Sequence, residues 1–134
     1  MPPIRSEVLE LRATPDIVHV RQTVRARAAE MGFTLVDQTK LVTAASELAR
    51  NAITYGGGGR VRIEALEEDT RRGLRLTFED QGAGIANVEQ ALTDGYTTGN
   101  GLGLGLGGAR RLVNEFSIHS RVGEGTRVTI TRWM

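Results

Sequence analysis

Glu47 and Asn51 have side-chain types and a spacing suited to chemistry on one ligand. They stand four positions apart in a segment whose apolar residues recur every three or four positions, so about 40° separates them on one helix face. An amide oxygen is a hard donor suited to Mg²⁺, and a carboxylate can orient or deprotonate a hydroxyl nucleophile. Taken alone, the pair is better explained as ordinary polar helix surface.

Asp80 follows a strand-like alternation of Leu74, Leu76 and Phe78 and shares their parity. The period of two therefore directs its carboxylate toward the core, where an ion needs a partner. The exocyclic amino group of adenine is such a partner, and Gly82 and Gly84 would let a flat ring approach the backbone. An Asp that caps a tight turn explains the same residues equally well.

A second sheet position shares this logic. Thr126 follows the turn at residues 123–125 and has the parity of Val128 and Ile130. If those two point inward, the Thr126 hydroxyl does too, at the end of the sheet where Asp80 is expected.

The glycine-rich stretch at residues 95–108 alternates glycine with leucine and precedes a helix-like segment. Its backbone N–H groups and the positive end of that helix suit a triphosphate. Gly103, Gly105 and Gly108 also match the dinucleotide fingerprint GxGxxG, but no strand leads directly into them, so we discount that match.

Composition narrows the class of protein. The 134 residues fit one domain, and the absence of cysteine excludes disulfides and thiolate zinc sites. A net charge of +1 is too balanced for a nucleic-acid binder. Lys40 is the only lysine, which excludes a P-loop and the eukaryotic-type kinases. Without a membrane-spanning run or signal peptide, we expect a cytoplasmic protein with no membrane partner.

The periodicities predict the elements that position these residues. We expect a strand at residues 7–12, a helix from Pro15 to Gly32 with Thr14 as N-cap, and a helix at 35–55. A hairpin follows, with strands around 61–65 and 74–78 and a charged turn at 67–73. Helical turns are expected at 86–93, a helix from 104 or 108 to 115, and strands at 116–122 and 127–133. This order indicates a single α+β domain, a two-layer sandwich, over residues 1–134.

The four patterns occur in one order: Glu47-x-x-x-Asn51, Asp80-x-Gly-x-Gly, the glycine run at 101–108, and Gly-x-Gly-Thr126. This order resembles the Bergerat (GHKL) ATP-binding fold of gyrase, heat-shock-90 chaperones, histidine kinases and mismatch-repair ATPases. Within that superfamily, residues 46–51 with 55–59, and 94–98 leading into 101–112, resemble RsbT-type switch kinases. These are small serine/threonine kinases of the bacterial stressosome.

The resemblance implies a mixed, mostly antiparallel sheet covered on one face by helices, with ATP and Mg²⁺ as cofactors. It implies Glu47 as the base on a seryl or threonyl hydroxyl, Asn51 as the Mg²⁺ ligand and Asp80 as the acceptor from adenine. The full nucleotide-binding set that it implies is Asn51, Asp80, Gly82, Gly84, Gly101, Leu102, Gly103, Leu104, Gly105, Leu106 and Thr126.

It also implies protein partners. The expected substrates are STAS-domain proteins of the stressosome scaffold and antagonist type, and the kinase, once released, would activate a metal-dependent serine phosphatase by binding its regulatory domain. Two alternatives stay open: an anti-sigma-factor kinase of the same fold, and a module that binds ATP without transferring phosphate.

Overall fold

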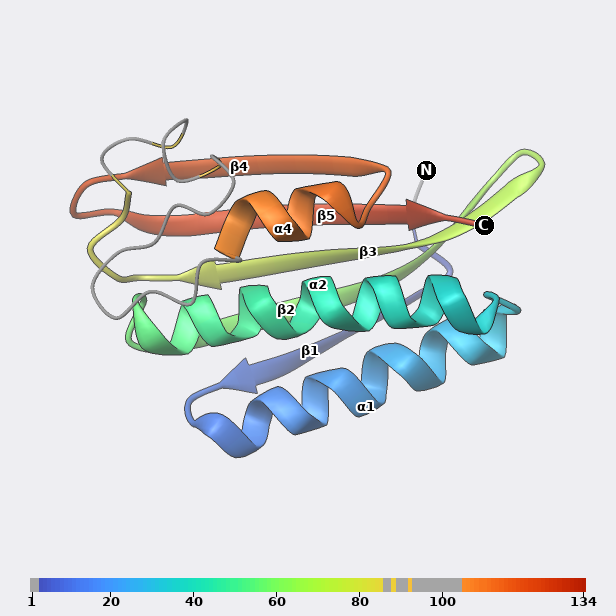
Figure 1. Cartoon of the computed structure of the whole chain (residues 1–134), viewed down its shortest axis with the longest axis horizontal. Coiled ribbons are helices and arrows are strands. Elements are labelled where there is room, and N and C mark those ends of the chain that lie inside the picture. The colour runs from blue at the N-terminus through green and yellow to red at the C-terminus, as the bar shows by residue number, and fades with distance from the viewer. Residues whose placement is uncertain (1–2, 86–87, 89–91, 93–104) are drawn as a thin grey trace.

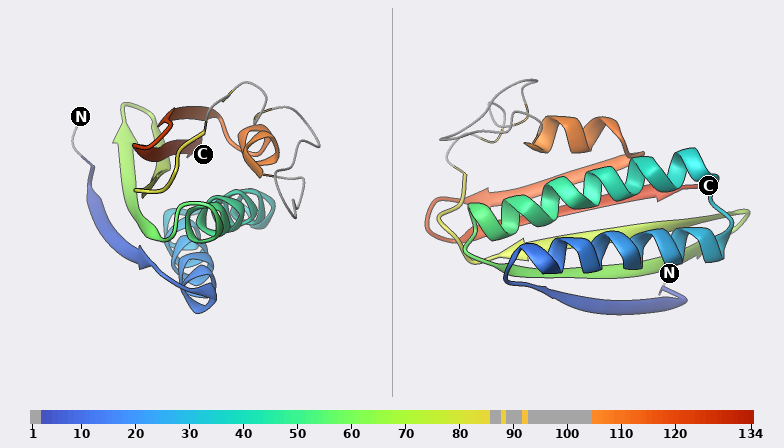
Figure 2. Two further views of the ribbon diagram at one scale, coloured as in Figure 1. Left: turned by 90° about the vertical axis from the view of Figure 1, so that its left-hand side faces the viewer. Right: turned by 60° about the horizontal axis from the view of Figure 1, so that its bottom comes forward.

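The computed structural model describes residues 3–85, 88, 92 and 105–134. Its elements are β1 (Arg5–Leu11), α1 (Thr14–Met31), α2 (Leu35–Thr54), β2 (Gly59–Glu68), β3 (Arg71–Asp80), α4 (Gly105–Arg111), β4 (Glu115–Arg121) and β5 (Gly125–Trp133). The sheet has the strand order β1-β2-β3-β5-β4, and each of these pairings is antiparallel. Helices α1, α2 and α4 lie on the same face of the sheet (Figures 1 and 2). The predicted two-layer α+β sandwich is confirmed.

The core lies between the sheet and the helices and is almost entirely aliphatic. The predicted helix stripes are confirmed because their members are buried: Ile17, Val20, Val24, Ala28 and Met31 on α1, and Leu41, Ala45, Leu48 and Ala52 on α2. Strand residues of one parity meet them, namely Leu11, Val61, Ile63, Leu74, Leu76, Phe78, Val128 and Ile130. This burial fixes which way each strand faces.

The start of α1 differs from the prediction. The N-cap is Ala13, and Thr14 is already helical, so the prediction of Thr14 as N-cap is wrong. Asp16 replaces it: one carboxylate oxygen accepts the backbone N–H groups of Arg12 at 2.7 Å and Ala13 at 3.0 Å. These bonds lower the pKa of Asp16. The predicted end at Gly32 is confirmed, with φ of 96° in the left-handed region.

The β2–β3 hairpin is longer than predicted. Residues 67–73, which we expected to form a turn, belong largely to the two strands, and only residues 69 and 70 lie between them. The charged residues pair across the strands, because Glu68 opposes Arg71 and Glu67 opposes Arg72, with N···O distances of 3.1 and 3.5 Å. Opposite charges on facing residues favour continued pairing.

The helix after the glycine run is shorter than predicted. α4 ends at Arg111, and Glu115 is the first residue of β4, so the prediction of a helix reaching residue 115 is wrong. A hydrogen bond of 3.1 Å from the Leu112 N–H to the Ala109 carbonyl closes the last turn. Alternating burial from Glu115 onward then favours pairing with β5 over further helix.

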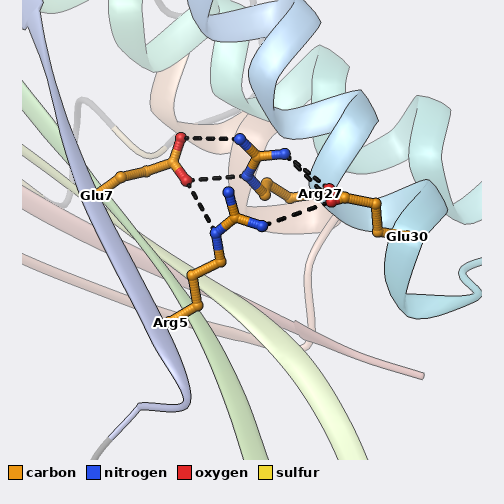
Figure 3. Close-up of polar contacts among 4 residues, drawn as sticks. All are labelled: Arg5, Glu7, Arg27 and Glu30. Carbon is orange, nitrogen blue, oxygen red and sulfur yellow. Dashed lines mark hydrogen bonds and ion pairs between the residues drawn. The ribbon is translucent and has the colours of Figure 1, made fainter.

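The edge strand β1 is fastened to α1 by an ion-pair cluster (Figure 3). Arg27 of α1 donates to Glu7 of β1, with 2.9 Å between Nε and Oε2, and pairs with Glu30 at 2.8 Å. Arg5 lies 3.6 Å from Glu7 and 3.5 Å from Glu30. The hydrogen bond to Glu7 raises the pKa of Arg27. An edge strand with one sheet neighbour thus gains a second attachment.

A further link joins β5 to the start of α2. Arg132 donates to Asp37 with 2.7 Å between Nη2 and Oδ1, and to the carbonyl of Leu112 at 3.0 Å. The hydrogen bond from Arg132 lowers the pKa of Asp37. Both links lie at the end of the sandwich where α1 joins α2 (Figure 1).

Candidate functional site

Glu47 and Asn51 lie on α2, as predicted, and both are half-buried at the edge of its apolar stripe. Glu47 is engaged by a neighbour: its Oε1 lies 2.8 Å from Nη1 of Arg50, and 16% of its side chain is exposed. The ion pair fixes one carboxylate oxygen. The other oxygen has no hydrogen-bond partner among the described residues, so Glu47 retains a free acceptor.

Asn51 faces the first residue of α4. A Cβ placed on Gly105 would lie 4.0 Å from the Asn51 side-chain nitrogen. The predicted ligand from the helix and the first described residue after the glycine run are therefore neighbours. At about 1.5 Å of rise per residue, the end of α2 at Thr54 lies about 4.5 Å from Asn51 along the axis, and Gly56 follows two residues later.

Asp80 meets α2 at that end. A Cβ on Gly56 would overlap the Asp80 carboxylate, and a Cβ on Gly82 would approach the Gly56 Cα to 2.5 Å. The Asp80 carboxylate thus points to the helix face, as its parity predicts. Its Oδ1 also accepts the Gly82 N–H at 2.9 Å, which is the turn-capping role left open above. Its second oxygen has no partner within the described residues.

Thr126 lies directly beside Asp80 in the sheet. The β3–β5 register pairs these two residues, and the β4–β5 register pairs Thr126 with Ser120. Asp80, Thr126 and Ser120 thus form one row across three strands on the face that the helices cover. The inward parity predicted for Thr126 is confirmed, since Val128 and Ile130 are buried. Sequence reasoning missed Ser120, because its place in the row depends on strand register.

The Ser120 hydroxyl joins the row to its surroundings. It accepts the Ile85 N–H at 2.8 Å, lies 3.1 Å from the Gly125 carbonyl and lies 2.9 Å from the Thr126 hydroxyl oxygen. Ile85 belongs to the segment that follows Asp80. The side chain therefore anchors that segment to β4.

Gly84 packs this same segment against the β4–β5 turn. Its φ is 79°, and a Cβ there would overlap the Arg121 carbonyl oxygen. The Gly123 N–H donates to the Ala83 carbonyl at 2.7 Å. Close backbone contacts thus account for glycine at positions 82 and 84, where we expected room for a flat ring.

Of the predicted phosphate-binding residues, the structure describes only Gly105 and Leu106, at the end of the glycine run. Gly101, Leu102, Gly103 and Leu104 lie outside the described residues, as do 86, 87, 89–91 and 93 of the predicted helical turns. Gly105 opens α4. Leu106 is 6% exposed and belongs to the hydrophobic core, so any contact of residue 106 with phosphate would come from its backbone.

A magnesium ion here would depend on few protein donors. The described residues contain no group of three or more His, Asp or Glu side chains that could hold a metal ion. Mg²⁺ usually keeps several waters and takes one or two protein ligands together with substrate phosphates. The half-buried Asn51 amide fits that pattern as a single protein ligand.

The sheet end also carries a cavity of about 300 Å³, lined by residues 79–81, 119–121 and 124–127. Although Asp80 and Thr126 border it, neither Glu47 nor Asn51 does. Glu79, Arg127 and His119 are in register with one another and have the opposite parity to Asp80. The lining thus includes residues of both parities, because Ser120 joins Asp80 and Thr126 there, and the cavity borders the adenine end of the predicted nucleotide site.

In the part of the chain that the structure covers, no helix combines the length and apolarity that a membrane crossing requires.

The chain is similar to several known proteins. A sequence model of the histidine kinase-, DNA gyrase B-, and HSP90-like ATPases matches residues 36–133. The serine/threonine-protein kinase RsbT of Bacillus subtilis is 45% identical over 119 residues, which are 89% of this chain and 90% of that protein. The anti-sigma F factor of Anoxybacillus flavithermus is 35% identical over 84% of this chain and 80% of its own length.

A solved structure matches as well. The RsbU and RsbW domains of a Mycobacterium tuberculosis protein give a TM-score of 0.67 at 28% sequence identity. The match covers 97% of this chain and 32% of that one.

Proposed function

This chain belongs to the histidine kinase-, DNA gyrase B- and HSP90-like ATPase family, and within it to the RsbT-type serine/threonine kinases, and from that membership we propose that it transfers the γ-phosphate of ATP to STAS-domain proteins. Residues 1–134 would form one kinase domain. After release from those substrates the chain would bind and activate the regulatory domain of a metal-dependent serine phosphatase. The phosphate transfer and the phosphatase activation, both between diffusible proteins, would take place in the cytoplasm.

One observation carries the proposal. The helix with Glu47 and Asn51 ends two residues before Gly56, Gly56 touches Asp80, and Asp80 is in register with Thr126. Acceptors suited to an adenine amino group thus lie at the sheet end, while Glu47, the proposed base, and Asn51, the proposed Mg²⁺ ligand, lie along the adjoining helix. A nucleotide lying along α2 would place its phosphates beside the start of α4 and its glycine run.

In the proposed reaction Glu47 accepts the proton of the substrate hydroxyl. The hydroxyl oxygen attacks the γ-phosphorus as the bond to the β–γ bridging oxygen breaks, and ADP leaves with that oxygen. Arg50 holds one oxygen of Glu47, so the free oxygen would face the hydroxyl. Asn51 would hold Mg²⁺, which supplies neutralisation of phosphate charge. Backbone amides of Gly101, Gly103 and Gly105 would donate to the phosphates.

The second candidate is an anti-sigma-factor kinase. The likeness to anti-sigma F factors over 84% of this chain favours it. It would use the same nucleotide site but would also sequester a sigma factor. Phosphorylation of a STAS-domain protein without binding to any sigma factor separates our proposal from this one.

We would test the kinase function with γ-labelled ATP and STAS-domain proteins encoded near this chain. We expect label transfer by the wild type. We expect Glu47→Gln to keep ATP affinity but to slow transfer by about 10²–10⁴-fold, the usual contribution of a general base. We expect Asn51→Ala to lose Mg²⁺-dependent ATP binding.

The matched control is Glu10→Gln, because Glu10 is exposed on β1 and has outward parity. It should transfer phosphate at the wild-type rate. Equal transfer by Glu47→Gln would exclude the proposed base, and ATP binding without transfer to any protein would favour a non-catalytic module.

A further inference from the structure

We propose that Ser120 determines the base selectivity of the site by fixing the direction of the Thr126 hydroxyl, an inference that rests on the nucleotide site proposed above. Ser120 would not touch the base. It would act as a positioning residue through Thr126, its partner across β4 and β5.

The hydrogen bonds of the Ser120 hydroxyl determine which residue donates in its contact with Thr126. The Ile85 N–H can only donate and the Gly125 carbonyl can only accept, so Ser120 accepts from the first at 2.8 Å and donates to the second at 3.1 Å. A serine hydroxyl has a single hydrogen. The hydrogen in the 2.9 Å contact with Thr126 must therefore come from Thr126.

Thr126 is then left as an acceptor. Its only hydrogen points to Ser120, so the lone pairs of its oxygen remain for a ligand. Asp80, directly opposite in the sheet, is an acceptor whose second oxygen has no partner among the described residues. Facing residues of neighbouring strands have Cβ atoms about 4.5–5.5 Å apart. Together they present two acceptors and no side-chain donor.

A binding site with two acceptors, from Asp80 and Thr126, distinguishes adenine from guanine. Adenine carries an amino group, a donor, at the ring position where guanine carries the O6 acceptor. The two acceptors bind the amino group of adenine and repel the O6 atom of guanine. Without Ser120 the Thr126 hydroxyl could rotate and donate to O6, and much of the discrimination would be lost.

The experiment measures the dissociation constants of ATP and GTP with Mg²⁺ for wild type and Ser120→Ala by calorimetric titration. We expect the wild type to prefer ATP, and the ratio of the two constants to fall about tenfold in Ser120→Ala, the range of one hydrogen bond. Loosening of the Ile85 segment would weaken both nucleotides alike, so the ratio isolates the effect on Thr126.

Two further variants secure the assignment. Ser120→Thr keeps the hydroxyl and should keep the wild-type ratio; a ratio lowered as in Ser120→Ala would mean that shape matters and would overturn the proposal. Thr126→Val removes the acceptor and should lower the ratio by itself. Adding Ser120→Ala to it should change the ratio no further, since Ser120 acts through that hydroxyl.

The outcomes separate the two proposals. A wild type that binds neither nucleotide would contradict the proposed function. A wild type that prefers ATP, with the same ratio in Ser120→Ala, would leave the function standing and overturn the role of Ser120. If Ser120→Ala does not fold, an unchanged ratio in Thr126→Val has the same meaning.

Discussion

At the scale of single residues, the Glu47 carboxylate is held by Arg50 one helical turn further along α2, with 2.8 Å between Oε1 and Nη1. Both side chains can adopt several rotamers in isolation, so the pair restricts the directions in which the free oxygen of Glu47 points. Arg50 would therefore orient Glu47, the proposed base. The sequence contains both residues, but their spacing of three equally describes an exposed pair with no such role.

Replacing Arg50 with Met keeps the apolar stem and removes the charge. We expect transfer to slow by up to about fivefold, because a partly exposed ion pair is worth about 0.2–1 kcal/mol. ATP affinity should stay within twofold. Single-turnover kinetics with γ-labelled ATP would measure the change, and an Arg50→Met variant with wild-type transfer would show that Glu47 needs no such orientation.

The predictions about residues succeeded where one periodicity was enough. The inward parity of Asp80 and Thr126 follows from alternation within a single strand. The row that they form with Ser120 does not, because it requires the registers of two strand pairs. The close contact of Gly56 with Asp80 was also beyond prediction, since it depends on where α2 ends relative to β3.

At the scale of elements, the helices and strands were predictable from apolar spacing, and their ends were less so. The charged residues between β2 and β3 resembled a turn, yet cross-strand pairs of opposite charge extend both strands through them. Thr14 resembled an N-cap, yet the Asp16 carboxylate satisfies the preceding backbone groups. Local side-chain bonds moved these boundaries, and hydrophobic periodicity contains no information about them.

Gly84 offers a test of how the segment after Asp80 is held. Gly84 and Gly123 have nearly the same φ, 79° and 81°, but only Gly84 would bring a Cβ against backbone, that of Arg121. We expect Gly123→Ala to lower the free energy of unfolding by about 1–2 kcal/mol through its left-handed φ alone. Gly84→Ala should lower the free energy of unfolding by about 1–3 kcal/mol more than Gly123→Ala, because the added methyl group has no space.

Urea denaturation of the two variants would measure the difference. Gly84→Ala should also weaken ATP binding, since the shifted segment carries the turn next to Asp80, whereas Gly123→Ala should not. Equal stabilities for the two variants would mean that the segment moves aside freely and that the contact with Arg121 does not position the site.

At the scale of the whole molecule, two sets of ion pairs join helices to strands at one end of the sandwich. Arg132 joins Asp37 and the Leu112 carbonyl, and the Arg27 cluster ties β1 to α1 near the same end. The candidate site occupies the opposite end, where α2 meets the turns after β3 and before β5. Changes that loosen the fastened end should therefore alter stability more than nucleotide affinity.

The Asp37–Arg132 bond makes part of this stability depend on pH. The bond holds the pKa of Asp37 below its unfolded value of about 3.9, so its contribution is complete above that value and is lost as the pH falls through the folded pKa. Asp37→Asn should lower the free energy of unfolding by about 1–2 kcal/mol at pH 7. The deficit should shrink as the pH falls from about 4 toward 3.

Denaturation curves between pH 3 and pH 7 would measure that deficit, with Glu124→Gln as the control. Glu124 is exposed in the β4–β5 turn, and its substitution should give only a small difference from wild type. A deficit for Asp37→Asn that stays constant down to pH 3 would contradict the assigned hydrogen bond.

The strand order also constrains the order of assembly during synthesis. β5 lies between β3 and β4 in the sheet but follows both in the chain, and β5 is the only strand that β4 pairs with in the described part of the fold. A growing chain on the ribosome can join β1, β2 and β3 early. Until β5 emerges, the free edge of β3 stays exposed and β4 has no neighbour, so Asp80 is translated well before Thr126 can come to lie beside it.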